Sequence, residues 1–479
     1  MSVIRGIPMI LKLHTMISAE AVRGYLNILK ENDKKTEYRI AELATQNGGR
    51  AYYVGGFVRD SIFGIDSKDV DIEVHGLDPS VLAGILEQIG EPLTFGKSFG
   101  VYSLKGCGID IAMPRREHAV GTGHRDFEVF VDPYIGTEKA ARRRDFTINA
   151  IMQDVLSGEI IDHFGGLDDL EKGIIRHVDP DSFAEDPLRV LRAAQFASRF
   201  GFSVAPETAD ICSGIDISTL SRERVEEELK KALLKGKRPS VFFETLRSFG
   251  RLEPWFGMLN ELVDLPQDPK YHPEGDVWVH TMQVIDRAAE YRDAVSDPYA
   301  FMLLCLCHDL GKIDVTEIVN GAIHSYGHET SGMSRVRDFI SAFVSANDVK
   351  EYVMNMVPLH MKPNVAASAR SAVKSTNRMF DSAKAPGDLV YFAMCDKPVF
   401  SGDTPFTGDS AFLFERLDVY KEMMSRPYVS GRDLVDAGLT PCPDFSKVLE
   451  YAHKLRLAGV EKKSALKQTL GFARSIGLE

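Results

Sequence analysis

Residues 68–74 read Lys-Asp-Val-Asp-Ile-Glu-Val, a run in which charged residues alternate with β-branched ones. This period of two is typical of a β-strand, and it places Asp69 and Asp71 on the same face of that strand. Two neighbouring carboxylates need a compensating cation, and Mg2+, which prefers oxygen ligands, fits that need. A solvated strand face is the simpler alternative, so the surrounding sequence has to decide between them.

Strand patterns on both sides of this run predict a sheet. They are residues 51–54, 101–104, 109–112 and 127–131, with helical patterns at 56–64 and 79–91. In the strand at 109–112, Asp110 stands between two apolar residues and could supply a third metal ligand. A small α/β domain that carries the acid pair is therefore predicted here.

Two glycines, Gly55 and Gly56, stand between the strand at 51–54 and the next helix. Bare backbone N–H groups at such a position can hold a phosphate, and Arg59 could add a cation one turn later. Two glycines after a strand are often only a tight turn. The acid pair that follows makes phosphate binding the better interpretation.

Residues 142–150 read Arg-Arg-Arg-Asp-Phe-Thr-Ile-Asn-Ala. These clustered cations and polar side chains suit a triphosphate and a ribose, with Arg144, Asp145 and Asn149 as the candidates. The structural alternative is a solvated basic helix start.

The length of 479 residues predicts about three or four structural units. After residue 166 the pattern becomes helical almost to the end, with Pro- and Gly-rich breaks at 265–273 and 401–408. We therefore predict an α+β protein with a mixed-sheet head and all-helical domains after it. The expected parts are a helical extension (1–45), the head (46–165), a helical neck (166–265), a second helical domain (270–400) and a helical tail (405–479).

The composition limits the function classes. A net charge of −12 argues against nonspecific coating of nucleic acid, although it leaves room for a local basic groove. The longest apolar run is far shorter than the ~20 residues that span a bilayer, and the first residues do not resemble a signal peptide. We expect a cytoplasmic protein that does not bind membranes, with reduced thiols at its six scattered cysteines.

The head motifs resemble the polymerase-β-type nucleotidyltransferase head of bacterial tRNA CCA-adding enzymes and poly(A) polymerases. The shared stretches are Gly55-Gly56 with Arg59, residues 68–71, 143–150, 165–176 and 183–192. The resemblance implies that Asp69 and Asp71 hold two Mg2+ ions and that the protein extends a tRNA 3' end from CTP and ATP. Ala140 departs from the family, which usually has an acid there, and this puts a local loop contact in doubt.

The resemblance also gives residues 183–192 a role. Asp186 and Arg189 resemble the family's protein template for the Watson–Crick edge of CTP or ATP, and Arg192 lies in the same motif. An Asp accepts from an exocyclic amine and an Arg fork donates to ring acceptors, which favours C and A. The structural alternative is an N-cap before Pro187 with Arg189 as a surface partner.

A second constellation lies in the helical part. Its members come from three helical runs: His280, then His308-Asp309, then Asp396. Two imidazoles and two carboxylates can bind a divalent metal. Their order resembles the HD phosphohydrolase superfamily, which implies phosphatase, 2'-nucleotidase or 2',3'-cyclic phosphodiesterase activity with Ni, Mn, Co, Fe, Zn or Mg2+. His328 and His360 are expected as outer positions, and His324 less so.

Basic residues predict where RNA lies. Five of them lie between residues 230 and 240 without an intervening acid: Lys230, Lys231, Lys235, Lys237 and Arg238. A solvated helix end is the alternative, but a basic stripe would let an acidic protein hold an RNA backbone. Just before them, Arg224 and Glu228 look like the family's supporting ion pair. The basic tail resembles the family's RNA-gripping end, and helical tails could equally mediate a homodimer.

The sequence predicts a tRNA nucleotidyltransferase with a second, hydrolytic site. Poly(A) polymerase, or an enzyme that adds only A or only CC, is the rival within the same superfamily. A nucleotide phosphohydrolase whose head only binds RNA is the rival from another class, and a noncatalytic RNA scaffold is the weakest alternative.

Overall fold

The computed structural model describes residues 31–65, 70–94, 100–119, 127–397 and 408–478. These residues form two compact units: the first comprises the described residues up to 197 together with 201–219, and the second comprises 198–200 together with the described residues from 220 onward. Asp69 and most of the predicted N-terminal extension lie outside the described residues. No helix among the described residues is both long and apolar enough to cross a membrane.

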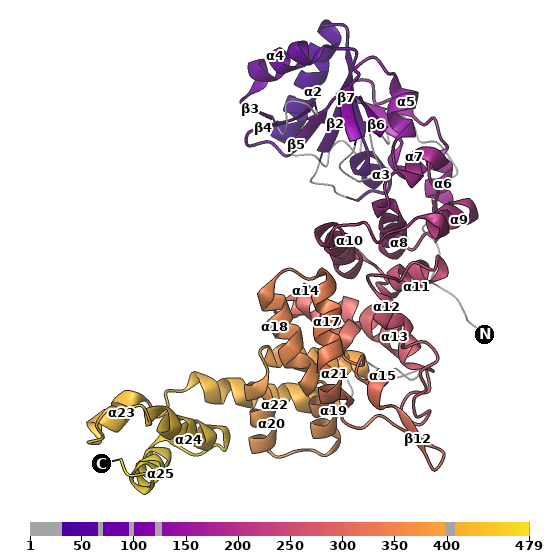
Figure 1. Ribbon diagram of the computed structural model, residues 1–479. Coiled ribbons are helices and arrows are strands. Elements are labelled where there is room, and N and C mark those ends of the chain that lie inside the picture. The colour runs from indigo at the N-terminus through magenta and orange to yellow at the C-terminus, as the bar shows by residue number, and fades with distance from the viewer. Residues whose placement is uncertain (1–30, 66–69, 95–99, 120–126, 398–407, 479) are drawn as a thin grey trace, which may run out of the picture. The chain divides into compact units, whose positions relative to one another are not determined.

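A seven-stranded mixed sheet forms the centre of the first unit (Figure 1), in the order β3-β4-β5-β2-β1-β8-β9. Strands β2 and β5 run parallel, and the other neighbours are antiparallel. The strands are β1 Arg50–Val54, β2 Val70–His75, β3 Pro92–Thr94, β4 Val101–Leu104, β5 Ile109–Ala112, β8 Met152–Asp154 and β9 Ile160–Ile161. Most side chains of β1 and β2 are buried, which makes these two strands the core of the sheet.

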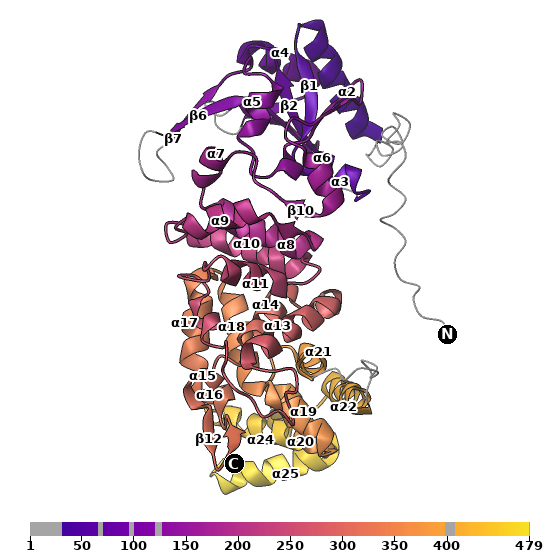
Figure 2. The same cartoon turned by 90° about the vertical axis from the view of Figure 1, so that its right-hand side faces the viewer.

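Helices pack around this sheet and carry the loops of the predicted site. Helix α2 (Glu31–Gln46) contacts α4 (Pro79–Ile89) and β1, while α3 (Gly56–Ile62) contacts β1 and β2. The β6–β7 hairpin (Arg115–Ala119 and Phe127–Val131) stands out from the sheet (Figure 2). The remaining elements are α5 Thr137–Arg142, η2 Thr147–Asn149, α6 Gly166–Lys172, β10 Ile174–Ile175, α7 Pro180–Ala184, α8 Leu188–Phe200, β11 Ser203–Val204 and α9 Pro206–Gly214.

The second unit is helical apart from the small hairpin β12–β13 (Glu317–Val319 and Ala322–His324). Helix α14 (Pro298–Cys307) is its central element, because every residue from Tyr299 to Cys307 is buried. A helix that is apolar on all sides belongs in a core. It contacts α10 (Arg222–Lys235), α13 (Val277–Ala288), α18 (Asn347–Met356) and α21 (Pro386–Asp396).

The other elements of the second unit complete the helical stack and its tail. They are α11 Ser240–Ser248, α12 Gly257–Asn260, η3 Ala289–Ala294, α15 Lys312–Val315, α16 His328–Ser331, α17 Met333–Phe343, η4 Val357–Leu359, α19 Met361–Ser368, α20 Val373–Ser382, α22 Gly408–Ser425, α23 Gly431–Asp436, α24 Phe445–Leu457 and α25 Lys462–Ser475. The tail has its own small core, in which Leu434, Leu439, Val448 and Ala473 are buried together.

The predicted α+β fold is confirmed, and the five predicted head strands are present. Four head strands were missed: β3, β6, β8 and β9. Three of these have only two or three residues, too few to show a period of two, and β6 consists mostly of charged residues. The domain boundaries remain predictions.

Candidate functional site

The two described acids of the head site lie on neighbouring parallel strands. Asp71 on β2 and Asp110 on β5 are register partners, so their side chains project from the same face of the sheet. Asp110 is exposed and Asp71 is half-buried, which leaves both accessible to a bound metal and its substrate. The structure thus brings together two of the three predicted catalytic acids, while Asp69 lies outside the described residues.

The glycine turn stands directly beside these acids. Gly55 has a φ of 69°, a conformation that favours glycine. A Cβ at this position would lie 3.2 Å from Nη1 of Arg144 and 3.6 Å from Oδ2 of Asp71. The bare backbone therefore lets a cation and a catalytic acid approach the same turn, with Gly56 at the first position of α3.

Four predicted nucleotide-binding residues form one chain of hydrogen bonds. Arg59 donates to Asp60 at 2.6 Å and to the amide oxygen of Asn149. Asn149 donates to Oδ1 of Asp145 at 2.9 Å, and Arg192 donates to Oδ2 of Asp145 at 2.7 Å. Arg59 is buried, so its guanidinium lies in the protein interior and stabilises this chain of hydrogen bonds there.

Burial raises the pKa of the Asp145 carboxyl, but Arg192 and Asn149 outweigh burial and hold its pKa below the ordinary value. Asp145 is therefore ionised and accepts hydrogen bonds from both side chains. It fixes Asn149 and Arg192 from two separate parts of the sequence.

The predicted template pair lies at the start of α8. The side chain of Asp186 accepts from the backbone N–H of Leu188 at 3.1 Å. Arg189 donates to the carbonyl oxygens of Ser182 at 2.6 Å and Arg143 at 2.7 Å. The guanidinium is thus held by backbone oxygens in a fixed orientation, and the pair lies beside the Asp145 network.

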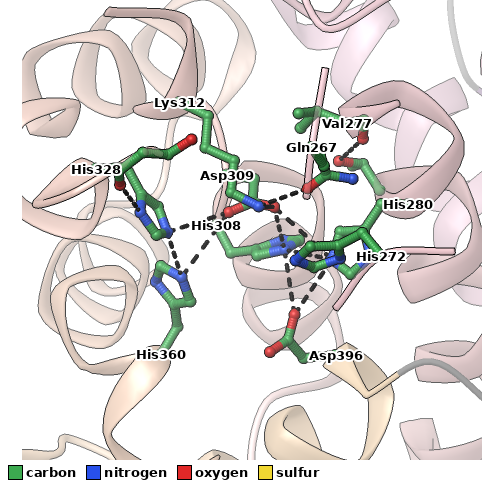
Figure 3. Close-up of polar contacts among 12 residues, drawn as sticks. Gln267, His272, Val277, His280, His308, Asp309, Lys312, His328, His360 and Asp396 are labelled. Carbon is green, nitrogen blue, oxygen red and sulfur yellow. Dashed lines mark hydrogen bonds and ion pairs between the residues drawn. The ribbon is translucent and has the colours of Figure 1, made fainter. Parts of the chain in front are cut away.

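Six residues of the second unit form a cluster that we call the histidine–aspartate cluster: His280, His308, Asp309, His328, His360 and Asp396 (Figure 3). In its first half, Nε2 of His280 lies 3.3 Å from Nε2 of His308 and 3.2 Å from Oδ1 of Asp396. Nε2 of His308 lies 3.2 Å from Oδ2 of Asp309. The structure thus brings together all four metal ligands predicted for this site.

The second half of the cluster shares Asp309. Its other oxygen, Oδ1, lies 3.3 Å from Nε2 of His328 and 3.9 Å from Nε2 of His360. The two Nε2 atoms lie 3.1 Å apart. His328 and His360, expected as outer positions, are therefore full members of the cluster. His324 is not, because its ring stacks on Tyr326.

The donor set fits metal ions. Nδ1 of His308, His328 and His360 each faces a backbone carbonyl, and Nδ1 of His280 faces a carboxylate, so each Nδ1 carries the proton. The four Nε2 atoms then face each other in two pairs. Such an arrangement is unfavourable unless a proton or a metal cation lies within each pair.

The charges differ between the two halves of the cluster. Burial lowers the pKa of His280, but hydrogen bonds with Asp396 and Glu274 outweigh burial and raise its pKa to about 9. His360 lies among other histidines, and burial lowers its pKa to about 3. Lys312 forms an ion pair with Oδ2 of Asp309 at 2.7 Å and donates a hydrogen bond to Oε1 of Gln267 at 2.6 Å.

A close backbone approach brings the two halves together. A Cβ at Gly311 would lie 2.0 Å from the carbonyl oxygen of His328 and 3.1 Å from Cα of Gly332. Only glycine fits there, so the turn after Asp309 can pack against α16 and carry His328 to the cluster.

Comparison with known proteins agrees with this geometry. Residues 51–176 match the family model described as the poly A polymerase head domain. The multifunctional CCA protein of Aromatoleum aromaticum is 35% identical over 429 residues, which cover 87% of this chain and 99% of that protein. This chain belongs to the multifunctional CCA protein family.

Two further comparisons extend this family assignment. The multifunctional CCA protein of Pasteurella multocida is 37% identical over 342 residues, which cover 69% of this chain and 79% of the relative. The structure of the Thermotoga maritima CCA-adding enzyme complexed with tRNA has a TM-score of 0.63 at 19% identity and covers 94% of this chain and 98% of that chain. The family fold therefore extends over nearly the whole chain.

The predicted basic stripe of this family member is partly neutralised. Lys230 pairs with Glu226 at 3.1 Å, Lys231 with Glu227 at 2.8 Å and Arg238 with Asp286 at 3.0 Å. The sequence showed no acid between the cations, but a helix brings acids three and four positions away onto the same face. Lys235 and Lys237 are exposed and have no acidic partner among the described residues, so they are the stronger candidates for RNA contact.

Several site residues escaped the sequence analysis. Glu73 is buried, pairs with His75 at 2.8 Å and lies 3.5 Å from Arg144. It continues the period of two from Asp69 and Asp71, which is a signal that could have found it. Glu274 and Lys312 contact the histidine–aspartate cluster, but they come from turns and short helices without a periodic pattern.

Proposed function

We propose that the protein is a CCA tRNA nucleotidyltransferase that adds or repairs the 3'-terminal CCA of tRNA from CTP and ATP. The observation that supports it most is the pairing of Asp71 with Asp110 beside the Gly55 turn and Arg144, in a chain of the multifunctional CCA protein family. A carboxylate pair next to a phosphate-binding turn is what transfer of a nucleotide requires.

In this proposal the head residues hold the reacting groups in line. Asp69, Asp71 and Asp110 hold divalent metal, expected to be Mg2+, which stabilises charge on the attacking and leaving oxygens when bound. Arg144 and the Gly55–Gly56 backbone hold the triphosphate. The tRNA 3'-oxygen forms a bond to the α-phosphorus, the bond to the β-phosphate oxygen breaks, and pyrophosphate leaves.

Selection of C and A falls to Asp186 and Arg189. Arg189 is oriented by two backbone carbonyls, and its remaining donors can address a ring nitrogen and a carbonyl of the base. Asp186 accepts from the exocyclic amine that cytosine and adenine share. The Asp145 network keeps Arg192 and Asn149 in place behind the nucleotide.

The histidine–aspartate cluster supports a second activity, metal-dependent hydrolysis of phosphoesters at RNA 3' ends. One divalent ion would be held by His280, His308, Asp309 and Asp396, and a second would be held by Asp309, His328 and His360. Bound metal would polarise the phosphoester and activate water. The mixed imidazole and carboxylate donors suit Ni, Mn, Co, Fe or Zn, with Mg2+ as the alternative, and phosphatase, 2'-nucleotidase and 2',3'-cyclic phosphodiesterase reactions are all candidates.

The first test measures nucleotide addition. The purified protein is incubated with Mg2+ and a tRNA that lacks its 3' CCA, with labelled CTP, ATP or both. We expect two C and one A, followed by arrest, and no addition by an Asp69→Ala, Asp71→Ala variant. Asp168→Asn is a matched control, because Asp168 forms an exposed pair with Lys172. Long A tails without C would instead support poly(A) polymerase.

The second test measures hydrolysis. After removal of bound metal, each divalent ion is added back with RNA that carries a 2'-phosphate or a 2',3'-cyclic phosphate. Asp309→Asn should abolish hydrolysis and leave CCA addition unchanged, while Asp348→Asn on the exposed start of α18 should change neither. Hydrolysis without any nucleotide addition would favour a phosphohydrolase with a binding head. Cytoplasmic location and a homodimer remain predictions, which fractionation and mass photometry would check.

A further inference from the structure

The four histidines of the cluster fix their rings in two different ways. His308, His328 and His360 each use Nδ1 to donate to the carbonyl oxygen three residues earlier, at 2.8, 2.8 and 2.7 Å. This bond is local and neutral. Nδ1 of His280 lies 2.7 Å from a carboxylate oxygen of Glu274 instead, and Glu274 lies outside α13, the helix that carries His280.

Glu274 is a buried carboxylate, with its side chain only 6% exposed. Its Oε1 accepts from His280 and also from Nδ1 of His272 at 3.0 Å. Its Oε2 is buried and has no hydrogen-bond partner among the described residues. The rings of His272 and His280 lie edge to face with centroids 4.7 Å apart. Since the His272 side chain is 23% exposed, the three residues connect the protein surface to the cluster.

Charge distinguishes this contact from the three carbonyl contacts. Nδ1 of His280 faces a carboxylate oxygen of Glu274 at 2.7 Å, whereas Nδ1 of the other three histidines faces a neutral backbone carbonyl oxygen. A carboxylate that accepts from Nδ1 draws the proton away from the ring and makes Nε2 a stronger donor to a metal than a carbonyl would.

We propose that Glu274 is a positioning residue that holds His280 in its metal-binding tautomer and strengthens its Nε2 as a ligand, with His272 as the solvent-side partner of the carboxylate. This rests on the proposed metal-dependent function of the cluster. It makes the Asp396 side of the cluster, where His280 binds, the tighter of the two metal positions.

The test measures metal binding to the full chain without bound metal, by titration calorimetry with Ni2+. The variants are made in an Asp71→Asn background so that the head contributes less to binding. Glu274→Ala should weaken Ni2+ binding about 10–100-fold, and Glu274→Gln less, because an amide oxygen keeps the hydrogen bond but not the charge. Glu351→Gln, in an exposed pair with Lys384, is the matched control and should not change the affinity.

A second readout separates positioning from general stability. The melting temperature without metal should stay near that of the parent for Glu274→Gln, while the rise in melting temperature on adding Ni2+ should shrink. Equal Ni2+ affinity for parent, Glu274→Gln and Glu274→Ala would overturn the inference and leave the metal centre intact. Absence of Ni2+, Mn2+ and Zn2+ binding to the parent would overturn the proposed function of the cluster itself. If Glu274→Ala does not fold, Glu274→Gln decides.

Discussion

The two sites of this protein differ in how much of the metal environment the chain itself supplies. In the head, Asp110 is exposed and Asp71 is half-buried. Arg192 donates to Asp145, and Arg144 borders the Gly55 turn. In the histidine–aspartate cluster, His280, His308, Asp309 and His360 are fully buried and already converge. The head site is therefore open to solvent, whereas the ligands of the histidine–aspartate cluster are enclosed by the protein.

This difference fits the substrates proposed for the two sites. A nucleoside triphosphate brings its own phosphate oxygens as ligands, so the head needs few acids and enough space for two substrates. A phosphoester brings fewer ligands, so imidazoles and carboxylates from the protein complete the coordination. Loss of one ligand should therefore affect activity alone in the head, but both activity and stability in the cluster.

The largest expected effect is on nucleotide addition. Asp71→Asn should lower CCA addition by at least about 10²–10³-fold, because it removes a charge that acts on the reacting oxygens. The melting temperature and the hydrolysis rate should stay unchanged, since Asp71 is half-buried on an accessible face. Labelled CTP incorporation and calorimetry measure both. A fall in melting temperature of many degrees would contradict the description of the head site as open to solvent.

Removal of a ligand from the histidine–aspartate cluster tests whether that cluster also contributes to stability. Asp309→Ala should abolish hydrolysis and also destabilise the metal-free protein by about 3 kcal/mol, because Lys312 is left as a buried cation whose remaining partner among the described residues is Gln267. Denaturant unfolding of the metal-free protein measures this. Asp309→Ala with Lys312→Met should recover much of the lost stability but none of the hydrolysis. Unchanged stability in Asp309→Ala would show that the Asp309–Lys312 ion pair does not stabilise the cluster.

A smaller effect is expected at the Asp145 network of the head. Arg192→Gln should destabilise the protein by about 1–3 kcal/mol at neutral pH, less than a fully buried pair because the Arg192 side chain is 29% exposed. The pKa of Asp145 is lowered in the folded state, so the stabilisation exists above the unfolded pKa and is lost as the pH falls through the folded pKa. The variant should unfold in acid at a higher pH than the parent.

Circular dichroism during acid titration checks this shift. Arg199→Gln, on the same helix, is the control, and its acid midpoint should match that of the parent. Equal midpoints for Arg192→Gln and the parent would mean that Asp145 is not held low by Arg192.

The smallest effect distinguishes lysines without an acidic partner from lysines that pair with acids. Lys235→Ala with Lys237→Ala should reduce the slope of log affinity for tRNA against log salt by about 1–2, since each phosphate contact contributes ~0.7–0.9. Lys230→Ala with Lys231→Ala should change the slope by less, because both lysines already pair with acids. Filter binding at several salt concentrations measures both slopes. Equal changes would mean that tRNA displaces the acidic partners.

Much of the head could be predicted from the sequence because its signals are local. The strand period of Val70–His75 places Asp71 on an accessible face, and the glycines stand where a strand meets a helix. The network that joins Arg59 to Asn149 and Asp145 to Arg192 could not be predicted, because its hydrogen bonds join residues 90 and 47 positions apart. Only the packing of α8 against the loop at 143–150 decides which cations brace the site.

The two motif sets, the α+β class and the family can be read from the sequence alone, because these depend on local periodicity and on residues close together in the chain. The tertiary structure decided that His328 and His360 share Asp309, that Glu274 holds His280, and that Lys230 and Lys231 are neutralised. The physical reason is that ligand geometry and charge pairing depend on distances between side chains. Helix packing and close contacts such as Gly311 against Gly332 set those distances, and no local pattern records them.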